Sequence, residues 1–322
     1  MNPEKWRKLV FYALHCTGFI LLFFVIRRLE FRKLIDLILL FPMWKVLAGL
    51  AILVLVYLIK TLRWFLINRM LEVRTSFSVL LSFFLVSGFL SVITPGRLGE
   101  FAKIWFLRKK YPVSVTLATS SVLLDRIWDV LVLSLMAASS MILLLSDFRI
   151  ELWSLILIIM LFFISVGVIM VPGLMFRPLL RLIRKGRLHD DILSVFGLWK
   201  RSRFGLLVPG LLTSLLAFLV LAFIPVMFSA ELDAPVGWPG SISAVSISNI
   251  LSFLPVTVAG FGTRELVFTG IWGMNGYPAE TAIAVSTAYF AATYLGSLLM
   301  GGMVYLLGFR KIYRLKELRE ES

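Results

Sequence analysis

The sequence contains one cysteine, Cys16, and two histidines, His15 and His189, among its 322 residues. A single cysteine excludes an internal disulfide and a multi-cysteine metal site. Two histidines far apart in sequence supply too few ligands for a metal centre. The sequence also lacks a glycine-lysine phosphate-binding loop, a Ser/His/Asp set and a zinc motif. We therefore predict no cofactor and no metal, and we expect neither an ATP-driven pump nor a hydrolase.

Charged residues are few, at 16%, whereas hydrophobic residues make up 60% of the chain and the mean hydropathy is +0.94. This balance predicts an all-α polytopic membrane protein. The net charge of +15 comes from short basic clusters that flank apolar runs, which is the positive-inside pattern and not a nucleic-acid-binding stripe. We expect these clusters to contact anionic lipid headgroups. They are Lys5/Arg7/Lys8, Lys60/Arg63, Arg69/Arg74, residues 108–110, residues 177–203 and residues 310–319.

Apolar runs of about 20 residues, the length that crosses a bilayer, predict about six full spans. They lie at residues 8–26, 43–62, 120–145, 151–172, 205–230 and 281–308. Two further runs, 76–93 and 241–256, are interrupted or rich in serine. Irregular backbone survives at membrane depth only when it is buried in protein or lines a wet cavity. We therefore predict that both runs form re-entrant helical hairpins.

The two predicted hairpins share a sequence pattern, which indicates an internal repeat. Each copy has a Ser-x-x-Leu-Ser segment, a Pro/Gly-rich tip with an arginine and a glutamate, and then Tyr-Pro followed by Ala-x-Ser. The copies cover residues 87–120 and 248–286. Paired apolar segments broken by Pro and Gly point to a transporter site between two repeats. The predicted hinge residues are Pro95, Gly96 and Gly99 in the first copy, and Pro255, Gly260 and Gly262 in the second.

Loop charges predict that the second copy is inverted relative to the first. Loops 146–151 and 231–240 carry no excess of cations and should lie outside, whereas the basic segment 173–204 should lie inside. Three spans then separate the hairpins, and an odd number inverts the second copy. This topology places both termini in the cytoplasm and the protein in the plasma membrane. Arg27 to Lys33 fit it poorly, so either an interfacial helix at 31–41 or an extra span is needed.

We expect one membrane domain over residues 1–322. Within it we distinguish N-terminal spans (1–75), a first repeat (76–145), middle spans with the basic connector 173–204 (146–240), a second repeat (241–308) and a basic tail (309–322).

Three charges lie inside the predicted span 120–145: Asp125, Arg126 and Asp129. Each costs roughly 2.5–3.5 kcal/mol near the bilayer centre, which favours a functional role such as a charge relay. Arg126 precedes Asp129 by three residues and can reach it. Asp125 is expected to point elsewhere and to need another cation, for which the candidates are Arg97, Lys103 and Arg264. The alternative is a purely architectural network of buried ion pairs.

The hairpin tips carry Arg97 with Glu100 and Arg264 with Glu265. The arginine fork suits phosphate, and the free N–H groups of a following helix attract anions. Together the tips predict a cradle for a phosphate headgroup, with Lys103, Thr94 and Asn249 as further candidates. Alternatively, each arginine pairs with the neighbouring glutamate and serves only the turn.

Residues 94–103 (Thr-Pro-Gly-Arg-Leu-Gly-Glu-Phe-Ala-Lys), 123–126 (Leu-Leu-Asp-Arg) and 260–265 (Gly-Phe-Gly-Thr-Arg-Glu) resemble the lysylphosphatidylglycerol synthase transmembrane-region family. The resemblance covers nearly the whole chain. It implies a multi-span domain that moves a lipid between leaflets, a phosphatidylglycerol derivative or a polyprenyl-phosphate. The implied functional residues are Arg97, Glu100, Asp125, Arg126, Arg264 and Glu265.

Two departures from the family pattern limit the resemblance. The chain ends after residues 310–322 without a soluble aminoacyl-transfer domain, so we do not expect it to synthesise lysyl-lipid. Residues 289–292 (Tyr-Phe-Ala-Ala) stand where relatives often have an arginine, so the second half of the site should carry less charge.

Our leading hypothesis is therefore a non-enzymatic lipid translocase that rocks one repeat against the other. A rival is a non-transporting scaffold that recruits a glycosyltransferase or lipid synthetase through residues 177–203. A membrane enzyme acting on lipid phosphates is disfavoured, because no nucleophile–base pair is visible.

Overall fold

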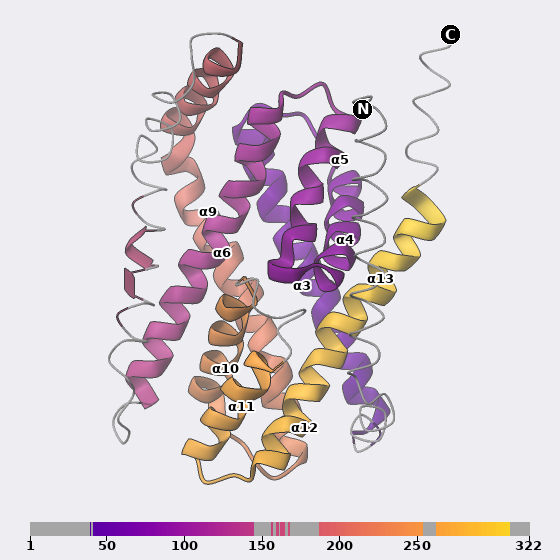
Figure 1. The fold of residues 1–322 in the computed structure, drawn as a ribbon, viewed down its shortest axis with the longest axis vertical. Coiled ribbons are helices and arrows are strands. Elements are labelled where there is room, and N and C mark those ends of the chain that lie inside the picture. Colours follow the sequence, from indigo (N-terminus) through magenta and orange to yellow (C-terminus); the bar gives the residue numbers. More distant parts are fainter. Residues whose placement is uncertain are drawn as a thin grey trace, which may run out of the picture.

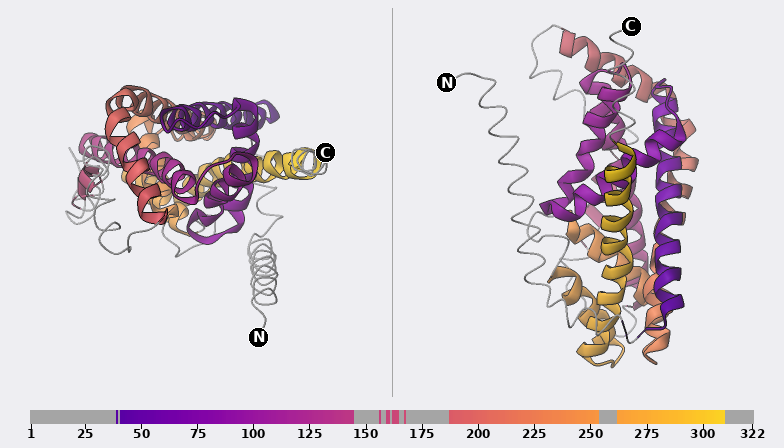
Figure 2. Two further views of the ribbon diagram at one scale, coloured as in Figure 1. Left: turned by 90° about the horizontal axis from the view of Figure 1, so that it is seen from above. Right: turned by 90° about the vertical axis from the view of Figure 1, so that its right-hand side faces the viewer.

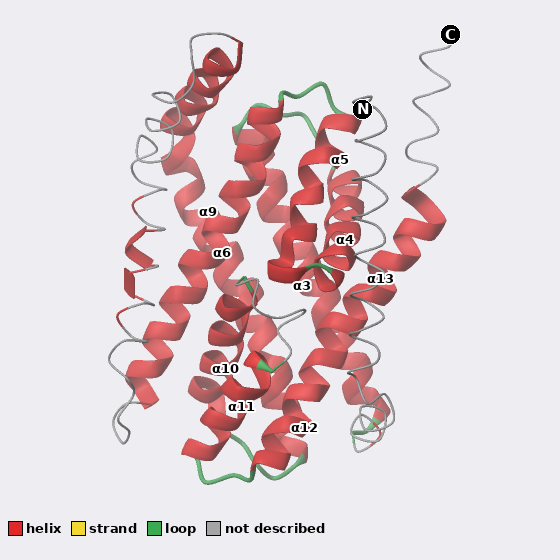
Figure 3. Ribbon diagram, in the orientation of Figure 1, coloured by secondary structure: helices red, strands yellow, loops and turns green. Residues whose placement is uncertain are grey.

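The computed structural model describes residues 41–144, 187–253 and 262–309, with single positions at 39, 156, 159–160, 162–164 and 167. Every regular element in this part of the chain is a helix (Figure 3). The prediction of an all-α protein is therefore confirmed for the described residues. The predicted spans 8–26 and most of 151–172 lie outside them, as do Pro255, Gly260 and the tail 310–322.

The N-terminal half of the described chain contains five helical elements. They are α3 (Met43–Met70), α4 (Phe77–Ile93), the 3₁₀ turn η1 (Pro95–Phe101), α5 (Ala102–Lys110) and α6 (Val115–Leu144). The C-terminal half consists of α9 (Arg187–Glu231), α10 (Gly237–Ser252), α11 (Thr263–Met274), α12 (Ala279–Phe290), the π-helix η2 (Ala291–Leu295), α13 (Gly296–Val304) and the π-helix η3 (Tyr305–Phe309).

Among the described residues, three stretches are long and apolar enough to cross a membrane: Met43–Met70, Val208–Glu231 and Ala279–Leu307. They correspond to the predicted spans 43–62, 205–230 and 281–308. Long apolar side chains on the first and last of them, including Leu47, Leu299 and Leu306, are exposed on the surface. A multi-pass membrane protein accounts for this outer surface, because lipid and not water covers it.

Two helices extend beyond the ranges that we predicted. α6 begins at Val115 and not at residue 120, because the hydroxyl of Ser114 accepts a 3.2 Å hydrogen bond from the backbone N–H of Leu117. α9 begins at Arg187, so residues 187–204 of the expected connector 173–204 are helical and continue into the span. The helix passes through Pro209 and Pro225 without a break.

The two helical hairpins run in opposite directions (Figure 1). In the first hairpin, α4 and α5 lie side by side and are joined by η1, and the rings of Phe83 and Phe106 pack with their centroids 5.5 Å apart. In the second hairpin, α10 and α11 pack together and are joined through residues 253–262. Figure 1 shows α4 with α5 extending toward one end of the long axis and α10 with α11 toward the other, with η1 near its middle.

α3 packs along α9 and also contacts α4 and α6 (Figure 2). Its buried face carries Val56, Trp64 and Ile67, which belong to the hydrophobic core, but also Thr61, Arg63 and Asn68. A spanning helix with polar side chains on its buried face turns them toward other helices, because lipid cannot hydrogen-bond them. This packing brings α3 charges against the middle of α6.

Candidate functional site

The tip of the first hairpin is a tight turn in the left-handed backbone region. Gly96 and Arg97 have φ values of 59° and 56°. The Thr94 hydroxyl accepts a 2.7 Å hydrogen bond from the N–H of Gly99 and donates one of 2.9 Å to the carbonyl of Leu90. For any residue that has a side chain, a positive φ is unfavourable in free energy. Such strained residues cluster at functional sites. The turn thus holds Arg97 in an orientation that a regular helix would not give it.

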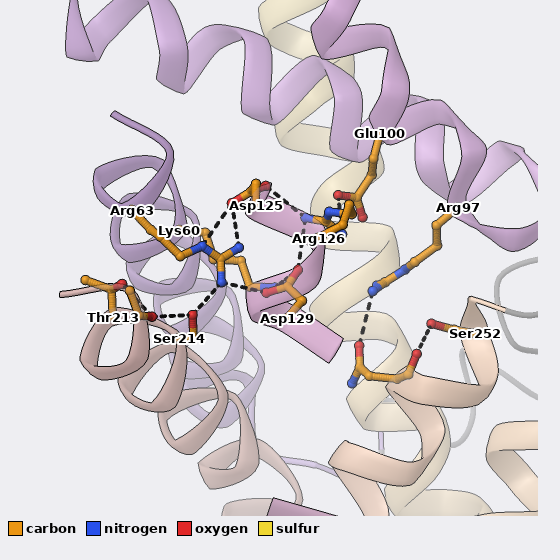
Figure 4. Close-up of polar contacts among 12 residues, drawn as sticks. Lys60, Arg63, Arg97, Glu100, Asp125, Arg126, Asp129, Thr213, Ser214 and Ser252 are labelled. Carbon is orange, nitrogen blue, oxygen red and sulfur yellow. Dashed lines mark hydrogen bonds and ion pairs between the residues drawn. The ribbon is translucent and has the colours of Figure 1, made fainter. Parts of the chain in front are cut away.

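Arg97 points away from its own hairpin and toward the second repeat (Figure 4). Its Nη1 donates a 3.2 Å hydrogen bond to Oδ1 of Asn249 on α10, and its guanidinium lies 5.6 Å from the ring centroid of Tyr294. Nε is buried without a hydrogen-bond partner, and no described carboxylate lies within 4 Å of the side chain. The alternative in which Arg97 pairs with Glu100 is therefore wrong.

Glu100 pairs instead with Arg126 of α6. The distance from Arg126 Nη1 to Glu100 Oε2 is 2.6 Å, and Lys103 Nζ lies 3.8 Å from the same oxygen. The hairpin is thus fastened to α6 by its glutamate, which leaves its arginine available.

The acids of α6 are surrounded by cations from α3, α5 and α6, of which Figure 4 shows those from α3 and α6. Asp125 accepts hydrogen bonds from Arg63 at 2.6 Å and Lys103 at 2.8 Å, and Arg126 lies 3.2 Å away. Asp129 pairs with Arg63 at 2.8 Å, Arg126 at 3.0 Å and Lys60 at 3.2 Å.

These contacts test the pairing predictions. The pair Arg126–Asp129 is confirmed, and Lys103 is confirmed as a partner of Asp125. Arg97 and Arg264 do not pair with Asp125, and the expectation that Asp125 points away from Arg126 is wrong, because the long arginine side chain curls back to its neighbour.

Lys60 and Arg63 are the members of this network that we missed. We assigned them to a basic cluster flanking a span, but both lie within α3, where Arg63 is fully buried. The available signal was the apolar sequence on their C-terminal side, residues 64–67, which continues the helix past them. Arg63 also donates a 2.7 Å hydrogen bond to Ser214 of α9, so it links three helices.

The tip of the second hairpin is organised differently. Gly262 has φ 85°, and its N–H donates a 2.7 Å hydrogen bond to Glu265, which caps α11. Arg264 pairs with Glu265 and donates a 2.9 Å hydrogen bond to Ser286. Here the alternative of local pairing is confirmed. The guanidinium of Arg264 also lies over the rings of Phe290, at 4.6 Å, and Tyr294, at 5.8 Å.

A partly open cavity, with about 630 Å³ of empty space including the part open to solvent, is lined by residues of α3, α4, η1, α6, α9, α10, α12, η2 and α13. Part of its wall is apolar, and the rest is polar or charged. The polar and charged lining residues are Tyr57, Lys60, Ser91, Arg97, Glu100, Arg126, Asn249, Tyr289, Thr293, Tyr294 and Ser297. Arg264, Glu265, Lys103 and Thr94 are not among the lining residues.

The cavity and the network behind it carry an excess of positive charge. The cations are Lys60, Arg63, Arg97, Lys103 and Arg126, and the carboxylates are Glu100, Asp125 and Asp129. Five cations thus face three carboxylates. In a medium of low dielectric constant this excess favours an anionic ligand. Among the described residues, no group of three His, Cys, Asp or Glu side chains is placed to hold a metal ion.

The chain matches a known protein family. Residues 8–301 match the family model of the lysylphosphatidylglycerol synthase TM region. The chain belongs to this family. The resemblance found in the sequence motifs is thereby confirmed.

Among curated proteins, the UPF0104 membrane protein MJ1078 of Methanocaldococcus jannaschii is 25% identical over 247 residues. The alignment covers 73% of this chain and 99% of that relative. No solved structure matches the chain.

Proposed function

We propose that this protein is a lipid translocase of the cell membrane that recognises the phosphate of an anionic or aminoacylated phospholipid, or of a polyprenyl-phosphate. The observation that carries the proposal is the guanidinium of Arg97, which lines the cavity and pairs with no described carboxylate. Arg97 is half-buried, and a guanidinium in such a position with unused donors is a strong phosphate ligand.

Asn249 and Tyr294 assist Arg97 in this proposal. Asn249 orients the guanidinium through Oδ1, while its Nδ2 donates to the carbonyl of Val245 and to Tyr289. Tyr294 presents its ring to Arg97 from the π-helix η2, and π-helical segments in α-helices are frequent at functional sites.

The remaining candidates hold the site together. Lys103 is fully buried against Asp125 and the rings of Phe84 and Trp64, away from the cavity wall. Arg264 and Glu265 form an ion pair with each other at the start of α11. Asp125, Arg126 and Asp129 fix the first hairpin to α6 and α3, and the balance of their charges sets the field in the cavity.

The hairpins supply the means of alternating access. We take both as re-entrant, because each is a pair of short helices that extends from near the middle of the molecule toward one end (Figure 1). Hairpins that open toward opposite ends suit an inverted repeat, in which rocking of one half exposes a central site to each leaflet in turn. The acyl chains would remain in the bilayer, against the exposed apolar side chains.

Leaflet exchange in proteoliposomes tests the proposal. Fluorescent phosphatidylglycerol is reconstituted with the purified protein, and a membrane-impermeant quencher reports the exchange rate. We expect Arg97→Ala to slow exchange at least about tenfold, the effect of losing one charge-assisted contact. Arg97→Lys should retain part of the rate, because it keeps the charge but loses the fork.

Arg108→Ala is the matched control. It removes the same side chain from the same hairpin, but Arg108 is exposed near the end of α5. Exchange by Arg97→Ala at the wild-type rate would overturn the site. A wild-type protein that exchanges neither phosphatidylglycerol nor a polyprenyl-phosphate would overturn the translocase and favour the scaffold.

A further inference from the structure

Lys60 combines two properties that no other cation of the buried network has together. Its side chain lines the cavity, and its amine can lose a proton. Arg63 and Lys103 lie behind the wall, and Arg97 and Arg126 are guanidiniums, which stay charged in proteins. The Lys60 side chain is 12% exposed, and its Nζ lies 4.2 Å from the ring centroid of Phe218.

The pairing pattern makes the Lys60 proton the least costly one to move. Among the described residues, Nζ of Lys60 contacts a single carboxylate, that of Asp129, at 3.2 Å from both oxygens. When Lys60 is neutral, Asp129 still pairs with Arg63 and Arg126. Protonating Asp129 would weaken three ion pairs, whereas deprotonating Lys60 weakens one.

Charge counting links this proton to the ligand. Apart from Arg97, the network holds four cations and three carboxylates, so neutral Lys60 leaves it balanced and charged Lys60 leaves an excess of one. Arg97 and Lys60 line the same cavity. An anion in that cavity therefore favours the charged form of Lys60, and the charged form favours the anion.

We propose that Lys60 is a proton-binding site coupled to the anion: the ε-amine takes up one proton when an anionic headgroup enters the cavity and releases it to the aqueous phase when the headgroup leaves. The nitrogen keeps its lone pair on release, and no other bond changes. The inference rests on the proposed function and deepens it. An anion of unit charge and one proton would move together as a substrate pair without net charge.

Other groups around Lys60 must be considered in any pH experiment. The titratable and charged neighbours that face it are Tyr57 and Arg63 on α3, Arg126 and Asp129 on α6, Arg97 and Glu100 on η1, Tyr289 on α12 and Tyr294 on η2; α9 contributes Phe218.

Proton-linked calorimetry tests the inference. The full-length protein in detergent is titrated with dihexanoyl phosphatidylglycerol, at several pH values from about 6 to about 10, the upper limit lying near the ordinary pKa of lysine. Each titration is repeated in two buffers of different ionisation enthalpy, so that protons bound per ligand are counted. We expect the wild type to take up as much as one proton at alkaline pH, with affinity falling by up to about tenfold per pH unit.

Two substitutions at Lys60 and one elsewhere identify the group. Lys60→Arg should bind with an affinity independent of pH and without proton uptake, because its charge is permanent. Lys60→Met should bind at every pH as weakly as the wild type does at alkaline pH. Lys45→Arg is the matched control: Lys45 lies on the same helix and pairs with Glu231 away from the cavity, so proton uptake should be unchanged.

The outcomes separate this inference from the proposed function. Binding without proton uptake by the wild type at every pH, or undiminished uptake by Lys60→Arg, overturns the role of Lys60 and leaves the lipid site standing. Failure of the wild type to bind the anionic lipid, or equal binding of dihexanoyl phosphatidylcholine, overturns the anion site itself.

Discussion

The side chain of Arg97 reaches Asn249 across 152 positions of sequence, with a distance of 3.2 Å between Nη1 and Oδ1. The two residues belong to different repeats, one at the tip of the first hairpin and the other near the end of α10. A neutral amide orients the guanidinium without cancelling its charge. This contact therefore joins the repeats and leaves a cation for a ligand.

Replacing that amide by a carboxylate should block the site from within. In Asn249→Asp the oxygen that lies 3.2 Å from Arg97 becomes part of a carboxylate, so the pair forms internally and excludes the phosphate. We expect exchange of fluorescent phosphatidylglycerol to fall at least about tenfold. Asn275→Asp makes the same change on the exposed end of α11 and should exchange at the wild-type rate. An undiminished rate in Asn249→Asp would show that the charge of Arg97 is not used.

Arg63 should contribute more to stability than an exposed arginine on the same helix. Arg63→Met leaves Asp125 and Asp129 with one cation fewer in a buried position, which costs about 3–5 kcal/mol in comparable pairs. Arg69→Met, in the last turn of α3 and exposed, should cost less than about 1 kcal/mol. Thermal or denaturant unfolding in detergent measures both. Equal stabilities would mean that water enters the network.

Gly99 should tolerate no side chain. A Cβ at this position would lie 2.2 Å from the carbonyl carbon of Leu90 and 2.3 Å from its oxygen, and a helix backbone cannot move aside as a side chain can. We expect Gly99→Ala to destabilise the protein by about 1–3 kcal/mol and to displace the tip that carries Arg97, so that lipid exchange is lost.

Gly270→Ala is the control for this change, because a Cβ there meets no atom within 4 Å. It should leave exchange unchanged. A stable and active Gly99→Ala would contradict the close packing of η1 on α4.

Arg264 should affect stability, whereas Arg97 affects binding. Arg264→Ala removes the partner of Glu265 and the donor to Ser286, a loss of about 1–3 kcal/mol, while the folded fraction retains affinity for dihexanoyl phosphatidylglycerol. Arg97→Ala should lose affinity for dihexanoyl phosphatidylglycerol but keep the stability of the wild type. Unfolding and calorimetry on the same preparations give both quantities. If both variants lose binding to the same extent, the two tips share the ligand.

Local sequence was sufficient for several features of this site. The pair Arg126–Asp129 follows from helix geometry at a spacing of three, and Arg264 with Glu265 closes a turn between adjacent residues. Pro95 and Gly96 mark the first tip because they are typical of a tight turn, and Gly99 marks it because a side chain there would meet the backbone of Leu90. The two sets of hinge residues are also the basis of the predicted repeat.

Pairing between distant segments did not follow from the sequence. Lys60 and Arg63 have the composition of a flanking basic cluster, and only the packing of α3 on α6 and α9 turns them toward Asp125, Asp129 and Ser214. Glu100 had two cations within reach, Arg97 and Arg126, and the left-handed turn at residue 97 decided between them.

By itself, the sequence determined that this chain is helical, lies in a membrane and belongs to its family, because composition, apolar length and short motifs are local properties. The tertiary structure decided which cation of the site, Arg97, has no carboxylate partner among the described residues. That choice depends on distances of a few ångströms between helices far apart in sequence, and Coulomb energy in a medium of low dielectric constant changes steeply over such distances.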